Sequence, residues 1–130
     1  MEVARFIRGK NISDAKKKLE KVIAMETAVP FARYHMDLGH KKGPLGPARF
    51  PVKTAREILR LLTAAEMNAL QKGLDGDTLY IFHISAHKGS TQFKPGRHRG
   101  RHAKRTHIEI ILMEREKEMK EKTTTRRKKK

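Results

Sequence analysis

The side chains best suited to chemistry in this sequence are cations gathered in one acid-free stretch. No Asp or Glu occurs between Thr78 and Ile108. Phe93 is the only large apolar side chain within residues 87–106, so this segment has almost nothing to bury in a core. Ammonium and guanidinium groups at this density favour contact with a polyanion, above all with phosphates. The segment contains seven of them: Lys88, Lys94, Arg97, Arg99, Arg101, Lys104 and Arg105.

Two histidine pairs, His83 with His87 and His98 with His102, have an H-x-x-x-H spacing that occurs in some metal sites. Zinc is not expected at either pair, because the chain has no Cys, no carboxylate lies nearby in sequence, and the arginines around His98 would repel a dication. The sequence also lacks a nucleophile elbow, a phosphate-cradling glycine loop and paired carboxylates in an apolar setting. We therefore expect no enzyme, no catalytic residue, no metal and no cofactor.

Composition narrows the class of partner. The 130 residues suit a single domain, and 31 Lys and Arg against 14 Asp and Glu give a net charge of +17. Relieving the self-repulsion of that charge requires bound anions, either nucleic acid or an anionic membrane surface. A membrane is disfavoured because no apolar run approaches the roughly 20 residues of a spanning helix, and no signal-peptide stretch follows Met1. The absence of Cys suits a reducing cytosol.

Two apolar runs flank the basic stretch and predict the strands that position it. Residues 79–86 and 106–113 are rich in β-branched and aromatic side chains at period-2 spacing. We expect a hairpin whose basic arm covers about residues 87–106, with His107 on the outer face. The predicted inner face consists of Tyr80, Phe82, Ile84 and Ala86 in the first run and Ile108, Ile110 and Leu112 in the second.

Two helices are predicted before the middle of the chain. Val3, Phe6 and Ile7 have helical spacing within residues 2–8, and Gly9 can end that turn with a positive φ. A second helix is expected from an N-cap at Ser13 to a stop before Pro30. Its apolar stripe is Ala15, Leu19, Val22 and Ile23, and the lysines beside it, Lys16, Lys17, Lys18 and Lys21, suit a solvated face and phosphate contact about equally.

The strongest helical periodicity follows, and we expect it to form the core helix. Thr54 and Glu57 have capping-box spacing, although Pro51 could also occupy the first helical position, and Gly73 is a plausible C-cap. The stripe should pack on the root of the hairpin. It consists of Ile58, Leu61, Leu62, Ala65 and Ala69.

A proline-rich loop separates the second and third helices. Residues 30–51 hold four of the five prolines and three glycines. Cations alternate there with Tyr34, which suits phosphate contact and base stacking, but a mobile solvated loop fits the composition equally well. The cations and histidines are Arg33, His35, His40, Lys41, Lys42 and Arg49.

The predicted fold class is therefore α+β, with helices packed on a small antiparallel sheet and a long basic β-hairpin arm. Residues 1–113 are expected to form one domain. Residues 114–130 are expected to form a charged, partly disordered tail, ending in a basic run typical of RNA-binding proteins.

Several segments, in order and spacing, resemble the universal large-subunit ribosomal protein family called L-twenty-two in bacteria and L-seventeen in the older eukaryotic and archaeal naming. Residues 97–101 match the family's Arg-x-x-Gly-Arg signature, and residues 29–34 are similar to its archaeal and eukaryotic branch. The matching segments are residues 6–10, 29–34, 39–41, 46–51, 66–69, 72–75, 83–88, 97–101 and 107–112.

The resemblance implies a non-catalytic protein of the cytoplasmic ribosome that binds large-subunit rRNA and lines the polypeptide exit tunnel with its arm. Its implied partners are rRNA, neighbouring ribosomal proteins and the nascent polypeptide, without a membrane or a homo-oligomer. The RNA-binding residues expected are Arg5, Arg8, Lys10, Arg33, Tyr34, His40, Lys41, Lys42, Arg49, His87, Lys88, Lys94, Arg97, His98, Arg99, Arg101, His102, Lys104 and Arg105.

The sequence departs from the family pattern at two places. Met1 falls within the first helical segment, so we expect the sheet to lack the edge strand that family members normally carry there, unless the start is truncated. The return from the arm is about four residues shorter than the family pattern. An architectural DNA-binding protein with a basic β-ribbon arm, in which Pro95 would wedge base steps, is the alternative from another class.

Overall fold

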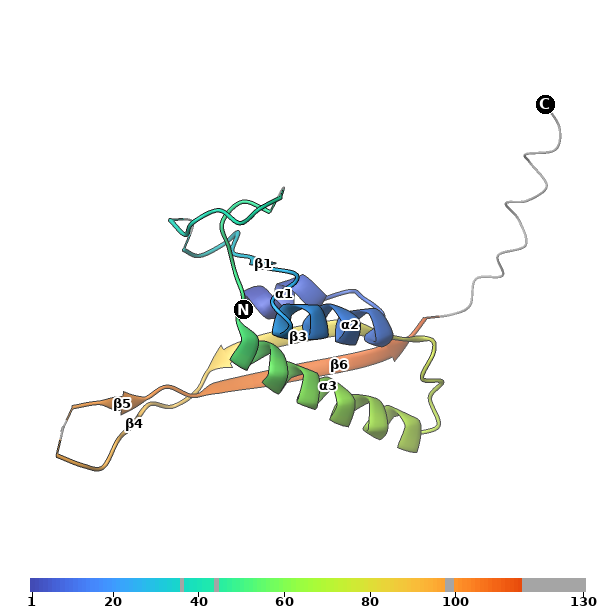
Figure 1. The fold of residues 1–130 in the computed structure, drawn as a ribbon. Coiled ribbons are helices and arrows are strands. Elements are labelled where there is room, and N and C mark those ends of the chain that lie inside the picture. The colour runs from blue at the N-terminus through green and yellow to red at the C-terminus, as the bar shows by residue number, and fades with distance from the viewer. Residues whose placement is uncertain (36, 44, 98–99, 116–130) are drawn as a thin grey trace.

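The chain folds into the expected α+β architecture, with helices on one face of a two-stranded antiparallel sheet (Figure 1). The computed structural model describes residues 1–35, 37–43, 45–97 and 100–115. In chain order the elements are α1 (Glu2–Ile7), α2 (Ile12–Ile23), β1 (Val29–Pro30), β2 (Ala48–Arg49), α3 (Val52–Gln71), β3 (Leu79–Lys88), β4 (Gln92–Phe93), β5 (His102–Ala103) and β6 (Thr106–Glu114).

The central hairpin pairs β3 with β6, from Leu79 opposite Glu114 to Lys88 opposite Thr106. The prediction of its inner face is wrong for the first half of β3. A β-bulge lies between Ile81 and His83, so Phe82 has no partner on β6 and its side chain is 55% exposed. The extra residue reverses the alternation of side chains at this point. Leu79 and Ile81 therefore face the core in place of Tyr80 and Phe82, whereas the inner face of β6 is as predicted.

The core lies between the inner face of this sheet and the helices. The α2 stripe packs inward as predicted, with Ile23 only partly buried, and α3 packs on both α2 and β6. The predicted α3 stripe is wrong at Leu61, whose side chain is 42% exposed because it lies at the edge of the packed face. Ala55, Ile58 and Leu62 of α3 meet Ile81 and Ile84 of β3 in one apolar cluster. A fully buried Leu or Ile side chain contributes roughly 1.5–3 kcal/mol by leaving water, so this cluster stabilises the body without help from the arm.

Gly9 and Gly73 follow α1 and α3 with positive φ as predicted, whereas the N-terminal ends of α2 and α3 differ from those expected. The N-cap of α2 is Asn11 instead of Ser13, and α3 begins directly after Pro51 without a side-chain cap from Thr54. The second helix ends at Ile23, well before Pro30, which instead pairs with Ala48 in the short β1–β2 ladder.

The outer edge of β3 is covered by the link between α1 and α2. The Gly9 amide donates to the Ile81 carbonyl at 2.9 Å, and the Ile81 amide donates to the Lys10 carbonyl at 2.9 Å. The Arg8 guanidinium adds a hydrogen bond from Nη2 to the Ile84 carbonyl at 2.7 Å. Gly9 has φ +73, a conformation that favours glycine. Although no full strand forms here, the edge is not left open to pairing with another chain.

Candidate nucleic-acid interface

The arm continues the central hairpin beyond Lys88 as a narrow two-stranded ribbon that projects away from the helices (Figure 1). Phe93 pairs with His102, and the Lys94 amide donates to the Arg101 carbonyl at 2.8 Å. In the described part of the arm, every Lys and Arg side chain is exposed and none forms an ion pair. His98 and Arg99 lie outside the described residues. The arm thus presents positive charge that the protein itself does not neutralise.

Two side-chain contacts organise this ribbon. The Phe93 and His102 rings are in contact, with centroids 4.1 Å apart and planes tilted by 42°, and Phe93 is nevertheless 71% exposed. Arg105 donates from Nη2 to the side-chain oxygen of Gln92 at 2.6 Å, so part of its hydrogen-bonding capacity is used within the arm. An exposed aromatic ring among cations is the arrangement on which unpaired bases stack.

The arm leaves the body at a point where the two sides of the hairpin cross closely. The Gly89 amide donates to the Arg105 carbonyl at 2.9 Å. A Cβ atom added to Gly89 would lie 3.0 Å from both the Arg105 Cβ and the His107 Nε2. Only glycine fits without displacing its neighbours, so this crossing fixes where the arm begins.

Three polar side chains, Ser85, His87 and Glu109, form a cluster on the outer sheet face next to the crossing. Ser85 Oγ lies 2.8 Å from His87 Nε2, and Glu109 lies 3.9 Å from the same nitrogen. His87, predicted to contact RNA, therefore already has partners within the protein. The arrangement is not a nucleophile–base–acid relay, because the carboxylate approaches the same ring nitrogen as the hydroxyl.

The proline-rich loop carries the second group of predicted RNA contacts. The Arg33 guanidinium lies over the Tyr34 ring at 5.4 Å, and the Lys41 ammonium lies over Phe50 at 5.8 Å. Tyr34 is 45% exposed, and Lys42 and Arg49 are also exposed. His40 forms an isolated bridge to Pro47. The loop is thus folded back on itself through β1 and β2, with its cations and its tyrosine outward.

The N-terminal group is more engaged in the fold than expected. Arg5 is exposed, but the guanidinium of Arg8 is bound to the backbone of β3. Lys10 lies so close to Lys18 that its hydrogen bond lowers the pKa of Lys18, with partial burial and the charge of Lys10 adding to the effect. Lys16, one of the lysines left open between solvent and phosphate, pairs with Glu66 of α3.

Two of these groups, the arm and the proline-rich loop, leave the body at the same end of the molecule. Figure 1 shows the arm and the proline-rich loop both leaving the body where α1 and α3 begin. The buried carboxylate of Glu2 accepts the Arg33 amide at 3.3 Å, which ties the loop to α1. The sequence did not single out Phe93 as a site residue, although it is the lone aromatic residue of the basic stretch.

Other kinds of site receive no support from the geometry. Within the described ranges, no three His, Asp or Glu side chains are placed to hold a metal ion. No helix in the part of the chain that the structure describes is long and apolar enough to cross a membrane.

Comparison with known proteins gives a consistent result. The sequence profile of the family described as ribosomal protein L22p/L17e matches residues 1–113. The chain is 46% identical over 125 residues to "Large ribosomal subunit protein uL22" of Staphylothermus marinus, covering 87% of this chain and 78% of that protein. A protein of the same name from Ignicoccus hospitalis is 44% identical, covering 87% and 77% respectively. The one from Methanopyrus kandleri is 46% identical over 123 residues, covering 88% and 77%.

Proposed function

The chain belongs to the ribosomal protein L22p/L17e family, and from that premise we propose that it binds large-subunit rRNA and lines the polypeptide exit tunnel with its arm. As a member it is a structural protein of the large ribosomal subunit in the cytoplasm and not an enzyme. Its partners are rRNA and other ribosomal proteins. This membership sets aside the alternative of an architectural DNA-binding protein.

The observation that carries the rRNA proposal is the unneutralised charge of the arm. Residues 79–107 contain no acid, and the described lysines and arginines of the arm have no carboxylate partner. Phosphates supply the missing charge, and exposed aromatic rings at Phe93 and Tyr34 supply stacking surfaces. The proposed RNA-binding set is the one expected from the sequence, with Arg8 and His87 reduced to lesser roles because their side chains already have partners in the fold.

Salt dependence of binding tests this proposal. The logarithm of the affinity of the full chain for large-subunit rRNA fragments should fall linearly with the logarithm of the salt concentration. The slope should be about −0.7 to −0.9 per phosphate contacted. In cells, the protein should co-sediment with large subunits and be released by RNase but not by DNase. A flat salt dependence would contradict an interface made of phosphate contacts.

The tunnel proposal rests on the shape of the arm and on the family. A narrow ribbon that extends beyond the globular body can reach into a space that the body cannot enter (Figure 1). A photocrosslinking amino acid at Arg97 should capture nascent chains in stalled ribosomes, whereas the same group at Lys72, the C-cap of α3, should not. Equal capture from both positions would contradict the tunnel-lining role.

A further inference from the structure

A hollow of about 620 Å³ lies at the root of the arm, between the start of α1 and the two chains of the hairpin. Its size falls within the roughly 300–1,000 Å³ of small-molecule sites. We call it the root hollow; it is lined by Met1, Ala86, His87, Lys88, Thr91, His102, Lys104, Arg105 and Thr106. We propose that the root hollow binds a single extruded nucleotide of rRNA, with the ammonium groups of Lys88 and Lys104 sharing its phosphate. This inference rests on the proposed rRNA-binding function and gives it one defined site.

The charge of the root hollow points to an anion. None of the nine lining residues is acidic. The side chains of Lys88 and Lys104 are exposed, and their ammonium groups have no hydrogen-bond or ion-pair partner among the residues that the structure describes. Two acids are near in sequence, but Glu2 is buried and accepts the Arg33 amide, and Glu109 lies with Ser85 on the outer sheet face. The positive charge of the hollow is therefore left for a ligand to neutralise.

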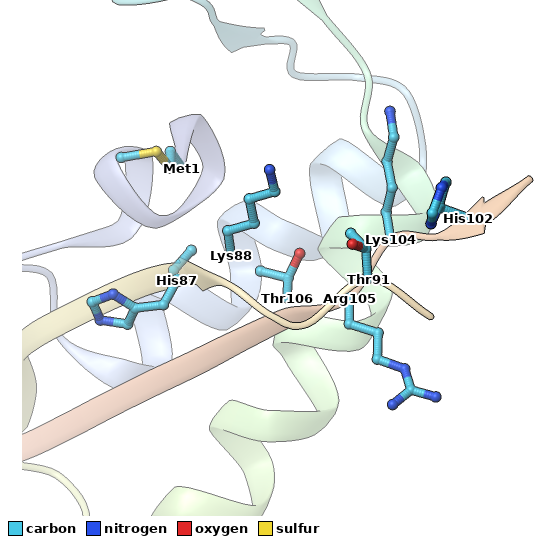
Figure 2. Close-up of a pocket in the computed structure, with 9 residues that line it drawn as sticks. Met1, His87, Lys88, Thr91, His102, Lys104, Arg105 and Thr106 are labelled. Atoms are coloured by element: carbon cyan, nitrogen blue, oxygen red, sulfur yellow. The ribbon is translucent and has the colours of Figure 1, made fainter. Parts of the chain in front are cut away.

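The side chains are directed so that two cations, and not three, can share one phosphate. Figure 2 shows Lys88 and Lys104 extending to the same side of the chain, with Thr106 between them, while Arg105 extends to the opposite side. Arg105 is also held by Gln92. The hydroxyl of Thr106 can donate to a phosphate oxygen or accept from a ribose 2′-hydroxyl.

Other lining groups favour a nucleotide over a bare phosphate. The His102 ring borders the hollow and lies against the Phe93 ring, with the centroids 4.1 Å apart, so it offers an aromatic surface on which a base can stack. Met1 and Ala86 add apolar surface on the side of the body. A phosphate alone would leave both of these surfaces unused.

The wall of the root hollow nearest the body is also held in shape before any ligand arrives. The Gly89–Arg105 hydrogen bond and the close approach of the two chains at Gly89 fix the wall from which Lys88 and Lys104 extend. A preformed site loses less conformational entropy on binding. Because the wall is the point where the arm begins, an occupant here also fixes the direction of the arm relative to the body.

The first test uses AMP as the probe and the full free chain in solution, followed by amide NMR. AMP should produce saturable shifts at Lys88, Thr91 and Thr106 and little change at Lys94. Adenosine or inorganic phosphate alone should shift these amides less. Shifts of equal size along the whole arm would overturn the proposal, as would adenosine acting as strongly as AMP. If inorganic phosphate shifts these amides as strongly as AMP does, the proposal of a nucleotide site is overturned and the hollow is only an anion site.

The second test compares two charge-matched double variants. K88Q/K104Q should abolish the AMP shifts, and K94Q/R101Q, which removes two cations farther along the arm, should keep them. With rRNA fragments, K88Q/K104Q should make the salt slope shallower by about 1, since both lysines contact one phosphate. A change of about 2 would mean two separate phosphates and would overturn the shared contact.

In reconstituted subunits, K88Q/K104Q should expose one rRNA nucleotide, or a few contiguous ones, to 2′-hydroxyl probing, at positions that K94Q/R101Q leaves protected. No localised change would overturn the site. If the unaltered chain fails to bind rRNA at all, the proposed function itself fails. If the chain binds rRNA and K88Q/K104Q binds it equally well, only the root site fails.

Discussion

The body and the arm of this protein are stabilised by opposite means. In the body, Leu19, Leu62 and Ile84 are fully buried, and the few polar groups inside are hydrogen-bonded. In the arm, Phe93 contacts His102 but stays mostly exposed. Ordering each backbone residue costs roughly 1–2 kcal/mol, which so little buried area cannot offset. From this comparison we expect the body to fold alone and the arm to depend on a polyanion to hold a single conformation.

Replacing residues 89–104 by an Asn-Gly turn should have the largest effect on binding and almost none on folding. It removes five cations, and rRNA affinity should fall on the order of 10³-fold at physiological salt. The melting temperature of the body should stay the same or rise slightly, because like-charge repulsion is reduced. Filter binding and thermal denaturation measure the two effects. Failure of the shortened chain to fold would show that the arm belongs to the core.

A cavity made in the body should have the opposite effect, a large loss of folding stability. Leu62 is fully buried, so Leu62→Ala should lower the free energy of unfolding by about 2–5 kcal/mol in urea denaturation. Leu61 is the matched control, since it is 42% exposed on the same helix and its replacement by Ala should cost about 0.5 kcal/mol or less. Similar losses from both variants would mean that the core is loosely packed.

The junction of the two regions should be sensitive to a single methyl group. Gly89→Ala would place Cβ 3.0 Å from Arg105 Cβ and 3.2 Å from its carbonyl carbon, so we expect a loss of about 1–3 kcal/mol. Gly39→Ala, with no atom within 4 Å of the new Cβ, should be close to neutral. Equal stability of the two variants, measured by urea denaturation, would show that the crossing yields easily.

The smallest effect concerns a pair of cations in the body. The Lys10 hydrogen bond is the main cause that lowers the pKa of Lys18, so Lys10→Gln should raise that pKa toward its ordinary value. With the pKa of Lys18 lower in the folded state, the unfolded chain binds more protons between the two pKa values, and stability rises with pH there. Lys10→Gln should make this rise of stability with pH smaller. NMR titration measures the pKa of Lys18 in this variant and in the control variant Lys17→Gln. If Lys10→Gln leaves the pKa of Lys18 unchanged, burial is the cause of the shift.

Much of the division between body and arm could be predicted from the sequence. The α3 stripe at Ile58 and Leu62, the alternation of β6 and the basic arm all depend on local spacing, and the structure confirms them. The bulge at Phe82 could not be predicted. One unpaired residue in a run of apolar side chains leaves no periodic signal, and whether Tyr80 or Ile81 faces inward is decided by packing against the helices.

The site was predictable as a region but less so residue by residue. Charge density located the arm and the loop, because every cation there lies outside an apolar pattern. Sequence could not show that Arg8 caps the β3 edge or that Lys16 pairs with Glu66, since these partners are far apart in the chain. It also could not show that Lys88 and Lys104, sixteen positions apart, extend to the same side of the root hollow.

The crossing at Gly89 has a consequence for how this protein can vary in length. Since β3 and β6 close the hairpin below the crossing, everything beyond it is, for the body, a loop whose ends are already held together. Closing a loop of twice the length costs only about 0.6 kcal/mol more. Insertions and deletions beyond the crossing are therefore almost neutral for the body's stability. The reach of the arm can be set by whatever surrounds it, independently of the sequence that folds the body.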